Sequence, residues 1–201
     1  MSGGRFREPL YRAERPQSPA RPHADNPAPR VLAMYRRIWE TTMRDLDFVN
    51  RALEVDIAGF RRHRGDWVGA VITPWFVNLY VLPGGGELWR DLGSGERVKL
   101  PFPIGELEFI ADYDPAAEIP AALYCPLLAP VTALKSQDEA LRMAMDALET
   151  LFTPAAVPPP AEAAAPATPE AAPDAAAPGD PAASSVPSRR AFFRRLAGHR
   201  S

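Results

Sequence analysis

Apolar residues recur every three or four positions in two stretches of the chain, and this spacing predicts an amphipathic helix in each. The first stretch covers about residues 31–46, where one apolar stripe is separated from most of the charged residues. The second follows Ser136, which forms a capping-box pattern with Glu139, and it extends to about residue 151 before Pro154 ends it. A helix is therefore expected at each end of a central segment.

The central segment carries short apolar runs and alternating patterns that are typical of β-strands. Glutamates alternate with apolar residues at 106–109, which predicts a strand with one solvated face, whereas residues 75–82 are apolar on both faces and predict a central strand. Strands are expected near 55–57, 67–72, 75–82, 98–102, 106–113 and 119–125. Because the helices are too few for parallel crossovers, we expect an α+β, two-layer domain: an antiparallel β-sheet of five or six strands flanked by an N-terminal and a C-terminal helix.

Proline divides the chain into segments. Of the 24 prolines in 201 residues, six fall in 1–30, eight in 31–153 and ten in 154–187. Proline lacks a backbone N–H and fixes φ, so the proline-dense stretches are incompatible with a helix or a sheet ladder. We expect a disordered Pro/Arg-rich arm at 1–30, an α+β core at 31–153, an extended Pro/Ala-rich linker at 154–187 and a basic tail at 188–201.

Charge follows the same division. The net formal charge is +3 for 1–30, −6 for 31–153, −4 for 154–187 and +5 for 188–201, which gives −2 for the whole chain. This balance gives no reason to expect a nucleic-acid partner. No run of about 18 apolar residues occurs, so no transmembrane segment is expected, and the expected compartment is the cytoplasm.

Residues that could support catalysis or bind a metal form no diagnostic motif. One cysteine, Cys125, and three histidines cannot complete a Cys-type zinc site or an iron–sulfur cluster. The motifs of serine hydrolases, zinc proteases and P-loop proteins do not occur. We therefore expect no enzyme activity and no cofactor, and interpret Cys125 as a buried small residue; an enzyme that uses Cys125 or a carboxylate is an alternative without motif support.

Aromatic residues are densest between Trp67 and Tyr80, where two Trp, one Phe and one Tyr fall within 14 residues. A sheet core explains most of this segment, but it explains Asn78 less well, because a buried amide needs hydrogen-bond partners. Two interpretations stay open: a core alone, or a surface that binds an extended peptide.

The same segment resembles the signature of the [NiFe]-hydrogenase assembly chaperones of the HybE/HupJ family. The matching residues are Trp67, Gly69, Ile72, Thr73, Pro74, Trp75, Phe76, Asn78, Leu79, Leu82 and Pro83. Two later stretches of the chain also resemble blocks of the family. The first is Phe102-Pro103-x-Gly105 followed by Phe109, and the second is Cys125-x-Leu127-x-x-Pro130. In the last block, Pro126 and Ala129 stand where the family has serines.

The resemblance implies a small α+β chaperone without a metal of its own, which assists maturation of an exported or membrane-bound [NiFe] hydrogenase before export. The implied partners are the precursors of the small and/or large hydrogenase subunit and other maturation factors. One hypothesis is that the chaperone binds the twin-arginine signal of the small subunit, with Trp75, Phe76 and Asn78 in the groove. The partner-binding candidates are Trp67, Thr73, Pro74, Trp75, Phe76, Asn78, Cys125, Pro130, Arg189, Arg190, Phe192 and Phe193.

The tail sequence SRRAFFR, residues 188–194, resembles the twin-arginine motif S/T-R-R-x-F-L-K. It is unsuitable as an export signal, because no apolar stretch and cleavage site follow it. Several roles stay open: a basic solvated tail, a segment that occupies the binding site of the core, or a contact with the export machinery. A further alternative is a peripheral membrane or interaction protein that uses residues 189–196.

Overall fold

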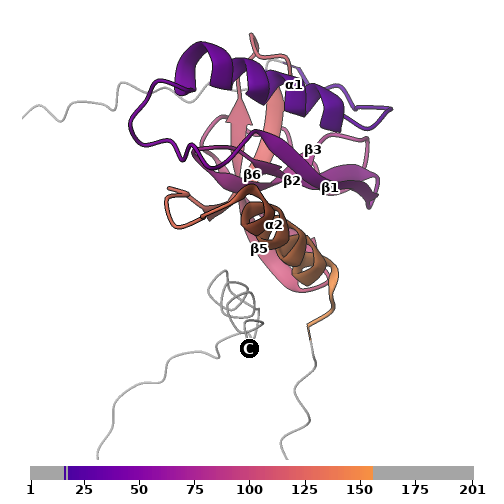
Figure 1. Cartoon of the computed structure of the whole chain (residues 1–201). Coiled ribbons are helices and arrows are strands. Elements are labelled where there is room, and N and C mark those ends of the chain that lie inside the picture. The colour runs from indigo at the N-terminus through magenta and orange to yellow at the C-terminus, as the bar shows by residue number, and fades with distance from the viewer. Residues whose placement is uncertain (1–15, 17, 156–201) are drawn as a thin grey trace, which may run out of the picture.

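The computed structural model describes residues 16 and 18–155 of the chain (Figure 1). Helix α1 spans Ala28–Ile38, a short π-helix η1 spans Trp39–Met43, and helix α2 spans Gln137–Phe152. The strands are β1 (Asp56–His63), β2 (Asp66–Ile72), β3 (Val77–Leu82), β4 (Arg97–Phe102), β5 (Gly105–Tyr113) and β6 (Ala121–Leu128). Within this described part, no helix combines the length and the apolar character that crossing a membrane requires.

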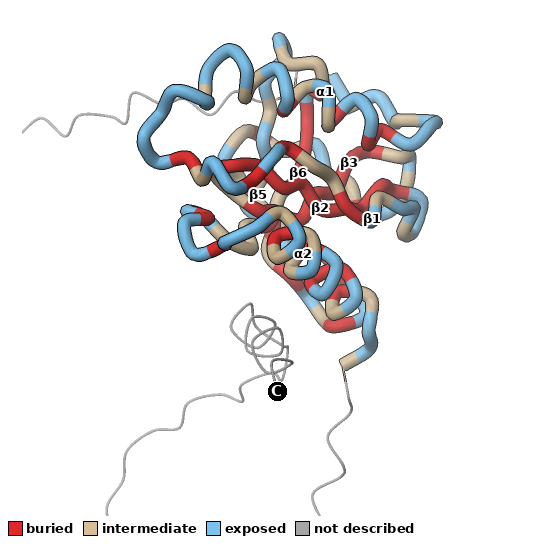
Figure 2. Tube along the Cα trace, in the orientation of Figure 1, coloured by how far each residue is buried: buried red, intermediate tan, exposed pale blue. Residues whose placement is uncertain are grey.

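The six strands form one antiparallel sheet in the order β1-β2-β3-β6-β5-β4. The first three strands follow one another as hairpins. The chain then crosses to the far edge, and β6 returns to pair with β3 at the centre of the sheet. The strands β2 and β3 are buried along their whole length (Figure 2), which confirms the expectation of a central strand in this part of the sequence.

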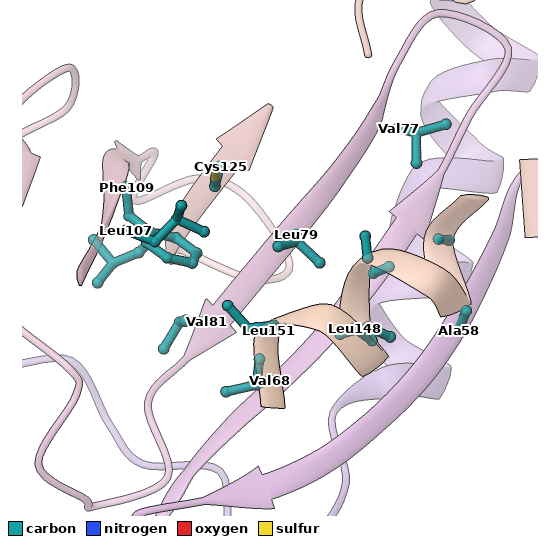
Figure 3. Packing of buried hydrophobic residues seen from close by; sticks show 14 of the residues in the cluster. Ala58, Val68, Val77, Leu79, Val81, Leu107, Phe109, Cys125, Leu148 and Leu151 are labelled. Carbon is teal, nitrogen blue, oxygen red and sulfur yellow. The ribbon is translucent and has the colours of Figure 1, made fainter. Parts of the chain in front are cut away.

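The two helices cover opposite faces of the sheet (Figure 1). Alternate residues of β2 separate accordingly: Val68 packs in the cluster with Leu148 and Leu151 of α2 (Figure 3), whereas Val71 packs in the cluster with Tyr35 of α1. The α+β class, the antiparallel sheet and the flanking helices are confirmed. Because the helices lie on opposite faces, the layers over β1–β3 are helix, sheet and helix rather than two.

Both helix starts are set by local sequence. The hydroxyl of Ser136 accepts a hydrogen bond from the backbone N–H of Glu139 at 3.2 Å, which confirms the expected N-cap of α2. Helix α1 begins at Ala28, earlier than residue 31, with a proline in its first turn. It passes into η1 at Trp39, where the hydroxyl of Thr41 donates to the Arg37 carbonyl at 2.8 Å.

The structured part of the chain also begins before residue 31. The backbone of His23 donates to the Pro83 carbonyl at 2.8 Å and accepts from the Trp67 indole at 2.9 Å. These partners lie 44 or more positions away, so the local pattern could not indicate them. The expectation of disorder is therefore wrong for residues 18–30; the linker and tail, apart from residues 154 and 155, lie outside the described residues.

Asp66 organises the loop that follows β3. Its carboxylate accepts four backbone N–H groups, those of Gly84, Gly86, Leu88 and Trp89, at 2.7 to 3.0 Å. The loop packs so closely on the β1–β2 turn that a Cβ on Gly86 would lie 2.1 Å from the Arg64 carbonyl oxygen. The carboxylate thus joins the first hairpin to the segment that leads toward β4.

Candidate functional site

The turn between β2 and β3 presents the most distinctive part of the sequence. The hydroxyl of Thr73 accepts from the backbone N–H of Phe76 at 2.9 Å and of Trp75 at 3.3 Å, and the Thr73 N–H donates to the Phe76 carbonyl at 2.8 Å. The Pro74 carbonyl accepts from the backbone of Asn50 at 2.7 Å. Thr73 and the buried Pro74 therefore hold Trp75 and Phe76 in a fixed turn outside the strand.

These two aromatic side chains pack against α1 and η1. The Trp75 ring stacks on Trp39 with centroids 6.2 Å apart and an interplanar angle of 16°. Phe76 meets Tyr35 edge to face at 5.5 Å. The cluster continues along the sheet, because Tyr80 of β3 lies 6.2 Å from both Tyr35 and Tyr124. The aromatic cluster, as used below, comprises Tyr35, Trp39, Trp75, Phe76, Tyr80 and Tyr124.

Four of the six residues of the aromatic cluster remain partly accessible. Trp39, Trp75, Phe76 and Tyr124 are half-buried, whereas Tyr35 and Tyr80 are buried. Half-exposed aromatic rings on a rigid turn are typical of surfaces that bind a partner, because they offer a large contact area at little cost in side-chain entropy.

The buried part of this region holds three polar side chains: Tyr35 and Tyr80 of the cluster, and Asn78 of β3. The hydroxyls of Tyr35 and Tyr80 are 2.5 Å apart. Burial raises the pKa of Tyr35 to about 12 and raises that of Tyr80 well above its usual value. Asn78 is 5% exposed, and its Oδ1 has no hydrogen-bond partner among the described residues. Both phenols therefore stay neutral at physiological pH, and the Asn78 oxygen is a buried acceptor.

A cavity of about 170 Å³ adjoins Tyr35 and Tyr80, between α1 and the sheet. Its lining combines apolar side chains with two carboxylates and comprises Val31, Met34, Tyr35, Ile38, Tyr80, Leu82, Asp112, Asp114, Ala117, Ile119, Pro120 and Ala122. Partial burial and the neighbouring Asp114 raise the pKa of the Asp112 carboxyl. A nearby cation would relieve this unfavourable environment.

The two carboxylates at this cavity are not neutralised within the described part of the chain. No ion pair there involves Asp112 or Asp114, whereas the nearby Glu118 is paired with Arg37 at 3.2 Å. We refer to the aromatic cluster together with Asp112 and Asp114 as the aromatic–acidic site. Its apolar walls, aromatic rings and unpaired negative charges are suited to a ligand that is both cationic and apolar.

The other predicted binding residues lie elsewhere. Trp67 is on the same face, but its indole binds the His23 carbonyl and its ring lies under Arg62, so it holds the N-terminal segment. Cys125 is buried on the opposite face, in the core under α2 (Figure 3). Pro130 is exposed beyond the end of β6. None of these three joins the aromatic–acidic site; Arg189, Arg190, Phe192 and Phe193 lie outside the described residues.

Sequence reasoning did not single out Tyr35, Tyr80, Asp112 or Asp114 as site residues. Tyr35 stands on the apolar stripe of the first helix, where an aromatic residue is usually core. Asp112 follows the alternation of β5 as one of several outward-facing acids. The signal that was available is the polar tip of Tyr35, which needs a partner when buried. Among the described residues, no group of side chains could hold a metal ion.

Comparison with known proteins agrees with this architecture. A sequence profile of the family described as "[NiFe]-hydrogenase assembly, chaperone, HybE" matches residues 26–195. The chain is 36% identical to the hydrogenase expression/formation protein HupJ of Bradyrhizobium diazoefficiens over 125 residues, which cover 62% of this chain and 71% of that protein. It is 45% identical over 80 residues to "Probable rubredoxin HupJ" of Rhodobacter capsulatus, which cover 40% of this chain and 29% of that longer protein.

The fold has a solved counterpart. The solution structure of HybE from Escherichia coli superposes with a TM-score of 0.52 at 25% identity, and the match covers 79% of this chain and 94% of that one. The family profile covers most of the 201 residues. The chain therefore belongs to the HybE family of [NiFe]-hydrogenase assembly chaperones.

Proposed function

We propose that this chaperone binds the twin-arginine signal of the hydrogenase small-subunit precursor at the aromatic–acidic site, in the cytoplasm and before export. Family membership supports the role in hydrogenase assembly. The observation that carries the choice of ligand is the pair Asp112 and Asp114, which border an apolar cavity without a cationic partner among the described residues.

A twin-arginine segment matches this site in chemistry. A guanidinium pairs with a carboxylate in a fixed planar geometry and also stacks on aromatic rings, so it can use Asp112 and Tyr124 together. The aromatic residue that follows the arginine pair suits the cavity of about 170 Å³, since a cavity of ~150 Å³ is known to accept a benzene-sized group. Leu46 and Phe48 are exposed apolar side chains. They come shortly before Asn50, whose backbone N–H binds the Pro74 carbonyl of the β2–β3 turn, and they offer contacts for the apolar stretch of a signal.

The proposal is tested with a fluorescent peptide that carries the motif S-R-R-x-F-L-K and an apolar extension. We expect the double variant D112N/D114N to weaken its binding at least tenfold, and W75A/F76A to do the same. The variant E106Q is the control, because Glu106 is an exposed acid of the same strand β5 outside the cavity. A second peptide with lysines in place of both arginines should bind more weakly, because an ammonium lacks the planar fork.

Fluorescence anisotropy gives the affinities, and circular dichroism verifies that each variant is folded. Equal affinity of the wild-type protein and D112N/D114N would remove the carboxylates from the binding site. If the peptide binds neither the wild-type protein nor any variant, the client contact lies in another part of the hydrogenase precursor.

A further inference from the structure

We propose that the C-terminal segment of this chain, residues 188–195, occupies the aromatic–acidic site in cis when no client is bound. The inference rests on the proposed function, because it assigns a second occupant to the same site. The segment SRRAFFRR carries the Arg-Arg-x-Phe order of a twin-arginine signal, and residues 188–201 have five arginines and no acid.

Charge and apolar character make this site a better match than two larger cavities of the described part. The cavity under the N-terminal segment, of about 380 Å³, is bordered by Arg21 and Arg30. The cavity between β1 and α2, also about 380 Å³, is bordered by Arg61, whose guanidinium already lies 3.6 Å from the centroid of Phe152. The first of these cavities also has Glu118 and the second Glu149, so neither lining has an excess of negative charge, whereas the aromatic–acidic site offers two carboxylates without cationic partners there.

The chain between the folded part and the segment is long enough. Thirty-two residues, 156–187, separate the last described residue from Ser188, and a flexible chain of that length has an r.m.s. end-to-end distance of about 30 Å. A domain of ~130 residues has a radius of gyration of about 14 Å. The segment can therefore reach any face of its own domain, and a proline-rich chain is more extended still.

Tethering makes even a weak contact effective. The effective concentration of a segment on such a linker is on the order of 1 mM. A cis contact with a dissociation constant of about 0.1 mM would then be mostly formed and would weaken client binding about tenfold. A client with additional apolar contacts displaces the segment, so the tail acts as a filter against weak ligands of the same charge.

The test compares client-peptide affinity in the full chain, in a protein lacking residues 188–201 and in two full-length variants. We expect the deletion and R189Q/R190Q to strengthen binding about tenfold. R5Q/R7Q is the matched control, because it removes the same charge from a part of the chain outside residues 188–195, and it should change the affinity by less than threefold. Equal or weaker binding by the deletion protein overturns the inference.

A peptide of residues 188–201, added to the deletion protein, separates this inference from the proposed function. We expect saturable binding that the client peptide displaces and that D112N/D114N abolishes. If the tail peptide binds and the client peptide does not, the proposed client is wrong while the inference stands; the reverse result rejects the inference alone. Light scattering of the full chain over a range of concentrations should show no increase in mass. A dimer that forms only when residues 188–201 are present would overturn cis occupancy, because it would show that the segment binds a second copy of the chain.

Discussion

Single polar side chains fix the loops of this protein through partners that are distant in sequence. Asp66 lies at the start of β2, yet all four backbone N–H groups that it binds lie 18 to 23 positions later. Four charge-assisted hydrogen bonds on one buried carboxylate compensate for its desolvation and hold the glycine-rich loop after β3. The periodicity of the sequence gives no indication of this role, because the partners are backbone groups.

The substitution Asp66→Asn should therefore be unusually costly for an isosteric change. An amide offers one acceptor oxygen, and its NH₂ group faces two N–H donors, so at least two buried donors lose their partner. We expect the free energy of unfolding to fall by about 3 kcal/mol. Urea denaturation measures the effect, with Asp146→Asn on the exposed face of α2 as the control. A loss below about 1 kcal/mol would show that water replaces the carboxylate.

At the scale of elements, the β2–β3 turn shows that an apolar run can predict a strand that is longer than the one that forms. Residues 75–82 predict one strand, but β3 begins at Val77 because the Thr73 hydroxyl binds the N–H groups of Trp75 and Phe76. The turn takes two aromatic residues out of the sheet and places them against α1. A hydrophobic pattern cannot distinguish an apolar residue in a strand from one that a side-chain hydrogen bond holds in a turn.

Thr73→Ala and Ser136→Ala form a matched pair at this scale. Both remove a hydroxyl that accepts backbone N–H groups, one in the turn and one at the N-cap of α2. Each should lower the free energy of unfolding by about 1 kcal/mol. Only Thr73→Ala should also weaken binding of the twin-arginine peptide, because it loosens Trp75 and Phe76. If both variants bind equally well, the turn is structural and not part of the site.

At the scale of the whole molecule, the phenols of Tyr35 and Tyr80 join α1 to the sheet by a buried hydrogen bond. Their hydroxyls are 45 positions apart in the chain and 2.5 Å apart in the structure. Burial favours the neutral form of both, since an ionised phenolate would lose its hydration. The stability of the whole domain is therefore linked to the protonation of this pair.

The direction of this linkage follows from the raised pKa. Below pH 10 both the folded and the unfolded chain hold the Tyr35 proton, so stability does not depend on it. Between pH 10 and the folded pKa of about 12, only the folded chain keeps the proton, and the free energy of unfolding should fall by about 3 kcal/mol across that interval. Urea denaturation at pH 9 and pH 11 should detect about 1.4 kcal/mol of this loss in the wild type. The double variant Y35F/Y80F isolates the contribution, with Y113F as the control. A pH dependence that persists unchanged in the double variant contradicts the assignment.

The sequence by itself determined the α+β class, both helices, the antiparallel sheet and the family resemblance, because periodicity, capping and motif residues are local properties of the chain. The sequence pattern did not predict the start of the first helix or the structured segment at 18–30. This segment depends on distant partners such as Trp67 and Pro83. The resemblance singled out Trp75, Phe76 and Asn78, but it also included Cys125, which the structure places on the opposite face of the sheet.

Only the tertiary structure decided which side chains meet. The sheet order brings β6 between β3 and β5, so that Tyr35, Tyr80 and Asp112 border one cavity although they are 77 positions apart at the extremes. The same order directs Cys125 toward α2 and Tyr124 toward the aromatic cluster, because successive residues of a strand face opposite ways. Strand pairing over such separations is set by the packing of the whole core, and it is this packing that assembles the aromatic–acidic site.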